Sequence, residues 1–139
     1  MRLGETDLAR PLRIEFPNAF YHVTSRGNER KTVFRNTGDR ERFLSYLESA
    51  HHRYGAILHV YCLMDNHYHL LLETPRGNLS QILHHINGAY TTYFNIRHGR
   101  SGHLFQGRFN TSQGDVDENN HFTSLGNSGR RFLCLGKRD

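Results

Sequence analysis

The feature that most constrains this chain is a short apolar segment in which two histidines, His67 and His69, stand two residues apart. Three leucines follow them, and such a run is typical of a buried β-strand. Successive side chains of a strand point to opposite faces, so residues two apart share a face with Cα atoms about 6.5–7 Å apart. Both imidazoles then point to one side, close enough to bind one divalent cation. Tyr68, Leu70 and Leu72 face a core on the other side.

The length and charge of the chain limit the number of domains and the kind of partner that we expect. Its 139 residues favour a single domain with one core. Lys and Arg outnumber Asp and Glu by 18 to 13, which gives a net charge of +5 with His neutral. This balance indicates either an anionic partner such as nucleic acid or simply a soluble basic protein.

The cysteine content and the hydropathy of the chain indicate in which cellular compartment we expect the protein. The two cysteines, Cys62 and Cys134, fit neither the pattern of a disulfide framework nor that of a thiolate zinc site, which favours a reducing environment. No apolar run approaches the roughly 20 residues that span a bilayer, and the N-terminus lacks the apolar region of a signal peptide. We therefore expect a cytoplasmic protein with no membrane partner.

Hydrophobic periodicity predicts the elements. Alternating patterns predict strands over residues 20–26, 56–64, 67–74 and 104–109. In the second of these, Leu58, Val60, Cys62 and Met64 are expected on one face. Helical spacing predicts one helix that begins near Thr37 or Asp39 and ends at Gly55, and another that begins near Asn78 or Ser80 and ends by about residue 98.

The resulting order, β-α-β-β-α-β, is that of the ferredoxin-like α+β fold, in which two helices cover one face of a four-stranded antiparallel sheet. We expect His67 and His69 on the uncovered face, because Leu70 and Leu72 need the covered one. Residues 1–12 are expected to form a loose N-terminal arm and residues 13–110 the domain. Residues 111–139, in which apolar positions follow neither period, are expected to be a poorly ordered C-terminal segment.

Three blocks resemble one family in the same order and spacing. They are YHVTSRGN at 21–28, LMDNHYHLLL at 63–72 and GHLFQGRF at 102–109. The family is the one-tyrosine HUH transposases, IS200-like, and especially the branch associated with repetitive extragenic palindromes (REP). The resemblance covers about residues 10–110.

The resemblance implies a metal-dependent nuclease and strand transferase that acts on single-stranded DNA, often at a hairpin. It implies that His67 and His69 hold Mg²⁺ or Mn²⁺, and that a tyrosine from a later helix becomes joined to the DNA. It also makes a homodimer plausible. Arg26 and Arg108 lie in matched blocks and Asn66 adjoins His67, so all three are candidates for DNA contact. Solvated surface and turn formation remain the alternatives for them.

The family's tyrosine motif, Tyr-Ile-x-Leu-Asn-Pro, is not found in this chain, and no Tyr follows Tyr93. The change of pattern after Phe109 indicates a frameshifted or truncated end, so the catalytic nucleophile and the third metal ligand remain unknown. Tyr90 continues the apolar stripe of its helix and is expected in the core. We hypothesise that this chain does not cleave DNA.

Two other functions stay open. The open basic face could bind nucleic acid as a non-catalytic regulator. A phosphoesterase that uses water as its nucleophile is a weaker alternative, because Glu73 is the only acidic residue on the histidine face of its strand.

Overall fold

The computed structural model describes residues 15, 17–116, 121–124 and 131–133, with side chains described up to residue 114. The expected N-terminal arm, residues 1–12, lies outside this part of the chain. The elements are β1 (Ala19–Arg26), a 3-10 turn η1 (Asn28–Arg30), α2 (Thr37–Tyr54), β2 (Ile57–Leu63), β3 (His67–Thr74), α3 (Leu79–His98), β4 (Asn110–Val116), β5 (His121–Ser124) and β6 (Arg131–Leu133).

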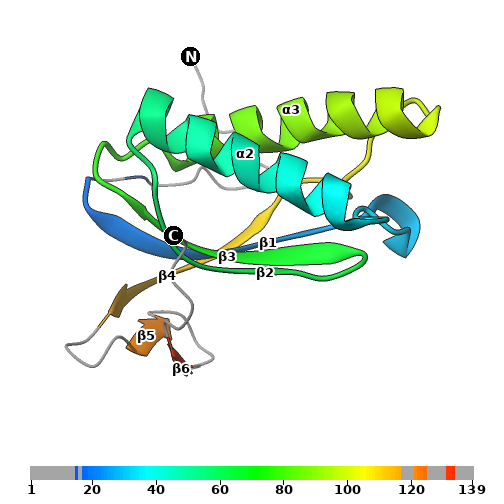
Figure 1. The fold of residues 1–139 in the computed structure, drawn as a ribbon. Coiled ribbons are helices and arrows are strands. Elements are labelled where there is room, and N and C mark those ends of the chain that lie inside the picture. The colour runs from blue at the N-terminus through cyan, green and yellow to red at the C-terminus, as the bar shows by residue number, and fades with distance from the viewer. Residues whose placement is uncertain (1–14, 16, 117–120, 125–130, 134–139) are drawn as a thin grey trace, which may run out of the picture.

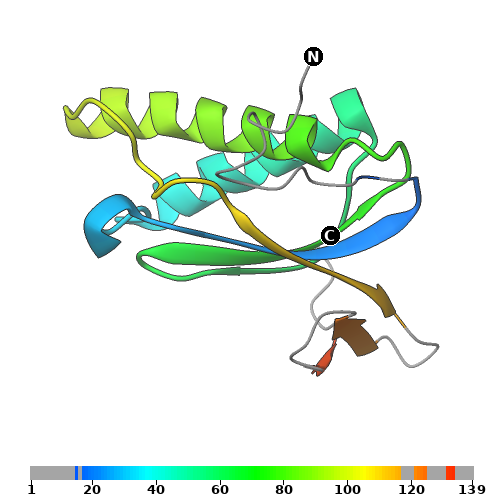
Figure 2. The ribbon, with the colours of Figure 1, turned by 180° about the vertical axis from the view of Figure 1, so that it is seen from behind.

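The strands form one antiparallel sheet in the order β2-β3-β1-β4-β5-β6. Helices α2 and α3 both lie on one face of the sheet, as the two opposite views show (Figures 1 and 2). The first four strands and the two helices confirm the predicted ferredoxin-like α+β fold. Strands β5 and β6 extend the sheet beyond β4. The proposed boundary at residue 110 stays a prediction.

The predicted strand over residues 104–109 is wrong. The strand that pairs with the second edge of β1 is β4, and residues 104–109 contribute only an isolated bridge between Gly27 and Phe105. Leu104 and Phe105 are adjacent and both buried, so the segment does not alternate between two faces. Apolar residues that close the core at a loop were mistaken for a strand.

The faces predicted for β2 are also wrong in part. Leu58 pairs with Leu72 on the helix side, but the next pair in register is Val60 with Leu71. The bulge at His59 adds one residue, and one extra residue reverses the alternation that follows it. Val60 therefore lies on the open face and Leu58 on the covered face.

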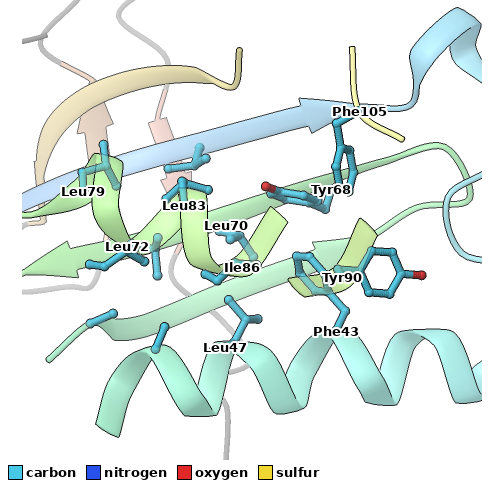
Figure 3. Close-up of a cluster of buried hydrophobic side chains, with 14 of the residues drawn as sticks. Phe43, Leu47, Tyr68, Leu70, Leu72, Leu79, Leu83, Ile86, Tyr90 and Phe105 are labelled. Atoms are coloured by element: carbon cyan, nitrogen blue, oxygen red, sulfur yellow. The ribbon is translucent and has the colours of Figure 1, made fainter. Parts of the chain in front are cut away.

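The core fills the space between the sheet and the helices. Side chains from β3 interdigitate with those of both helices (Figure 3). Phe43 on α2 contacts Tyr68 on β3 and Tyr90 on α3, with ring centres 4.8 and 5.3 Å apart. The Tyr90 hydroxyl donates a hydrogen bond of 2.5 Å to the carbonyl of Val33. Tyr90 is fully buried, which confirms its predicted place in the core.

The beginning of α2 is tied to the end of α3 by Asp39. The helix is capped by Asn36, not by Thr37 or Asp39, since the Asn36 side chain accepts the Asp39 N–H at 2.8 Å. The Asp39 carboxylate is fully buried and accepts hydrogen bonds from Tyr93 at 2.8 Å and from His98 at 2.9 Å. Burial raises the pKa of Asp39, but the bonds from the Arg35 N–H, Tyr93 and His98 outweigh it, so the net pKa is below its ordinary value.

We expect Asp39→Asn to lower the free energy of unfolding by about 3 kcal/mol at pH 7, because it removes a buried charge and leaves its partners unmatched. A carboxylate with a depressed folded pKa stabilises the fold above its unfolded pKa, and this stabilisation is lost as the pH falls below about 3.9. Urea unfolding of the wild-type protein and the variant at pH 7 and at pH 3 measures how much free energy of unfolding the substitution removes at each pH. Glu41→Gln, the same change at an exposed position of α2, is the control. An equal loss at both pH values would contradict the account.

Candidate metal centre on the open sheet face

The register between β1 and β3 defines the open face. His67 lies opposite Arg26 and His69 opposite Thr24, and paired residues of adjacent strands point to the same side. Tyr68 and Leu70, which alternate with the histidines, are buried beneath the helices, whereas His67 and His69 are only partly buried. The predicted placement of both imidazoles on the uncovered side is therefore confirmed.

The separation of the two ring centres is compatible with a shared ion. Their ring centres are 5.0 Å apart with an interplanar angle of 82°. An ion about 2.1 Å from one nitrogen of each ring would separate the centres by about 4.7 Å at a right angle and about 5.4 Å at the tetrahedral angle. The observed 5.0 Å lies between these two values. Within the described residues, no cluster of three or more His, Cys, Asp or Glu side chains has a metal-binding arrangement.

The turn that precedes His67 is fixed by backbone bonds. The carbonyl of Asn66 accepts the Gly27 N–H at 2.8 Å, and the carbonyl of Asp65 accepts the Val33 N–H at 2.7 Å. A Cβ at Gly27 would lie 2.2 Å from the carbonyl oxygen of Lys31, so only glycine allows the chain this close approach. The end of β1 and the start of β3 are therefore held together at the site.

Each imidazole has a defined partner at its Nδ1 atom. His67 Nδ1 lies 2.8 Å from the side-chain oxygen of Asn66. His69 Nδ1 lies 3.1 Å from His22 Nε2 and 3.3 Å from the hydroxyl of Thr24. Burial, and then the charges of His67 and Arg26, lower the pKa of His69, which favours the neutral ring that metals bind.

The predicted DNA-contact residues are divided between two places. Arg26 is exposed on the open face beside the imidazoles, and Asn66 lies in the adjoining turn. Arg108 lies instead in the loop after α3, where it lines a cavity of about 740 Å³ with α3 residues that include His84 and Asn87. His67 and His69 do not line this cavity.

All seven tyrosines lie within the described residues, and none lies on the open face. Tyr21, Tyr61 and Tyr68 belong to strands, and each packs on the helix side of the sheet. The remaining tyrosines are on the two helices: Tyr46, Tyr54, Tyr90 and Tyr93. The described part of the chain therefore presents no phenol next to His67 and His69.

Sequence reasoning missed His22 and Thr24. Their alternation with buried residues of β1 placed them on one face, but the sequence did not give the register that brings them to His69. Nothing in the sequence spacing indicates a contact between residues 47 positions apart.

Comparisons with known proteins agree with this architecture. The family model described as "Transposase IS200 like" matches residues 15–121, and the chain belongs to this family. No curated protein matches the sequence. Within the described residues, no helix is long and apolar enough to cross a membrane.

Two of the solved structures that match this chain illustrate the shared fold. One is a REP-associated tyrosine transposase bound to a REP hairpin, with 14% identity and a TM-score of 0.61 over 77% of this chain. This chain spans 62% of the length of that protein. The other is a protein described as a transposase of Deinococcus radiodurans R1, with 18% identity and a TM-score of 0.58 over 79% of this chain and 88% of its own.

Proposed function

We propose that this chain is a transposase domain that binds single-stranded or hairpin DNA on its open sheet face, with one Mg²⁺ or Mn²⁺ held by His67 and His69. The observation that carries the proposal is the pair of imidazoles 5.0 Å apart beside Arg26, on a face that no helix covers. The similarity to a transposase bound to a REP hairpin supports hairpin DNA as the ligand. Two histidines leave most of an octahedral shell to water and phosphate oxygens, so the metal should bind more tightly with DNA present.

The residues of the open face would have separate functions in metal binding and phosphate contact. When bound, the cation would supply neutralisation of the scissile phosphate and stabilisation of its leaving oxygen. His67 and His69 fix the position of that charge on a rigid strand. Arg26, across from His67, offers a planar pair of N–H donors to a phosphate oxygen. Arg108 would contact DNA that continues past the sheet edge toward α3.

We infer that this chain binds DNA without forming the family's phosphotyrosine bond by itself. The support is the absence of any of its seven tyrosines from the open face. The same observation favours the second candidate function, a non-catalytic DNA-binding regulator. The two differ in their need for metal, because only a cleavage site requires His67 and His69 to hold a cation.

A homodimer is part of the proposal. Strand β2 is an edge strand of the sheet, and an edge strand carries backbone groups that can pair with a second chain. Sedimentation equilibrium measures the oligomeric state directly.

We expect Arg26→Ala to weaken binding of a fluorescent hairpin oligonucleotide about tenfold, because it removes a charge-assisted contact worth about 1.5 kcal/mol. It should also lower the salt dependence of binding by about one counterion. Fluorescence anisotropy over a salt series measures both. Arg97→Ala removes the same charge from an exposed position of α3 and is the control. Equal affinities for the two variants would contradict a binding face at Arg26.

Incubation of this chain with a hairpin oligonucleotide and Mn²⁺ should give no protein–DNA adduct on a denaturing gel. A phenol must reach the scissile phosphate to form the adduct, and the open face has none in the described residues. An adduct that disappears when a single tyrosine is changed to Phe would overturn this prediction. Tyr90→Phe and Tyr93→Phe are the first variants to examine, because these are the last two tyrosines of the chain.

A further inference from the structure

We propose that Asn66 and His22, with Thr24, are positioning residues that hold the protons of His67 and His69 on Nδ1 and so leave both Nε2 atoms free to bind a metal. A neutral imidazole has one N–H and one lone pair, and the hydrogen bond at one nitrogen decides which atom can coordinate. Partners of this kind orient the ring and set the affinity of many metal sites. The proposal rests on the metal site proposed above and assigns roles to residues outside the ligand pair.

The bond between Asn66 and His67 has only one direction. The Asn66 amide nitrogen donates to the carbonyl of Arg30 at 3.3 Å, which identifies the atom facing His67 as the amide oxygen. An amide oxygen can only accept, so His67 Nδ1 carries the proton. The lone pair of His67 is then on Nε2. The backbone of Asn66 is held by the bond from the Gly27 N–H to its carbonyl, and its side chain by the bond to the Arg30 carbonyl.

The contact between His69 and His22 brings one nitrogen of each ring within hydrogen-bond distance, with the two ring planes nearly parallel. The ring planes differ by only 8°, and the ring centres are 5.2 Å apart while the nitrogens are 3.1 Å apart. The difference corresponds to roughly the radii of the two rings, so both nitrogens lie near the line that joins the ring centres. An imidazole N–H and an imidazole lone pair both lie in the ring plane, so the facing nitrogens of the two rings can share one hydrogen bond.

Thr24 helps to decide the direction of that bond. Its hydroxyl lies 3.3 Å from the same Nδ1 atom of His69. One N–H can be shared between two acceptors in a three-centre bond, whereas one nitrogen lone pair cannot align with two donors at once. The arrangement therefore favours a proton on His69 Nδ1, with His22 Nε2 and the Thr24 hydroxyl as acceptors. His69 Nε2 is then left with its lone pair, as in His67.

The two positioning contacts come from different parts of the fold. Asn66 belongs to the turn before β3, while His22 and Thr24 belong to β1. The role of His22 therefore depends on the pairing of β1 with β3, which places Thr24 opposite His69. A similar pair on the same face, His59 and Glu73, is 3.0 Å apart, but His59 has no contact with either proposed ligand among the described hydrogen bonds and ring contacts. It provides a matched control.

The test reads the tautomers directly by two-bond ¹H–¹⁵N NMR of the imidazoles in metal-free protein near pH 8, where ordinary histidines are neutral. Wild-type His67 and His69 should both show the proton on Nδ1. The double variant His22→Phe with Thr24→Val should shift His69 toward the Nε2–H form, and Asn66→Ala should do the same for His67. When Gln replaces Phe at position 22 of this double variant, the side chain again offers an acceptor, and His69 should return toward the Nδ1–H form. The control His59→Phe should change neither ring.

Calorimetric titration with Mn²⁺ alone gives the consequence for binding. The double variant and Asn66→Ala should each lose about 10–100-fold in affinity, the usual effect of removing such a partner. Unchanged tautomers in the variants, or an Nε2–H form in wild-type His67 or His69, would overturn the proposal. Failure of the wild-type chain to bind Mn²⁺ would instead overturn the proposed metal site, and the NMR result would still decide the roles of Asn66 and His22.

Discussion

The antiparallel pairing of β1 with β3 is the constraint on which the rest of the site depends. It sets Arg26 opposite His67 and Thr24 opposite His69, and it brings His22 to the second imidazole. Because the side-chain period of a strand is two, a slip of one residue would turn the imidazoles toward the helices and Tyr68 toward solvent. The core prevents this slip, since Tyr68, Leu70 and Leu72 are buried beneath α2 and α3 (Figure 3). Packing on the covered face thus determines which side chains point to the open face.

The sequence predicted β3 to the residue, because His67 and His69 alternate with the apolar residues Tyr68, Leu70 and Leu72 and so leave only one way to orient the strand. It also predicted both helices within a residue or two, since their apolar stripes are regular and Gly55 and Gly99 take positive φ at their ends. It failed where the local pattern does not carry the information. The bulge at His59 is a property of strand pairing, and the buried pair Leu104 and Phe105 belongs to a loop that closes the core. His22 was missed because register is a tertiary feature.

The two sides of the sheet have different roles. The covered side holds the aromatic core and the tyrosines of the strands and helices, including Tyr90 and Tyr93, which hydrogen-bond to Val33 and Asp39. The open side holds the imidazoles, Arg26 and the polar side chains of β1. The resemblance to the family implies a nucleophilic tyrosine on a later helix, in a motif that this chain lacks. The proposed metal and DNA face therefore lies on the side of the sheet opposite to the one on which this chain's own tyrosines pack.

The most direct measurement of the central claim is a titration of ¹⁵N-labelled protein with Mn²⁺, followed by paramagnetic broadening of backbone amides. The account predicts that broadening begins at residues 66–69, where β3 starts, and at residues 24–26 of β1. The double variant His67→Ala with His69→Ala should abolish this broadening. The helix amides of Leu47 and Ile86, on the far side of the core, should broaden last. Broadening that begins instead at the histidine pairs His51–His52 or His84–His85, or that persists in the double variant, would contradict a metal site on the open face.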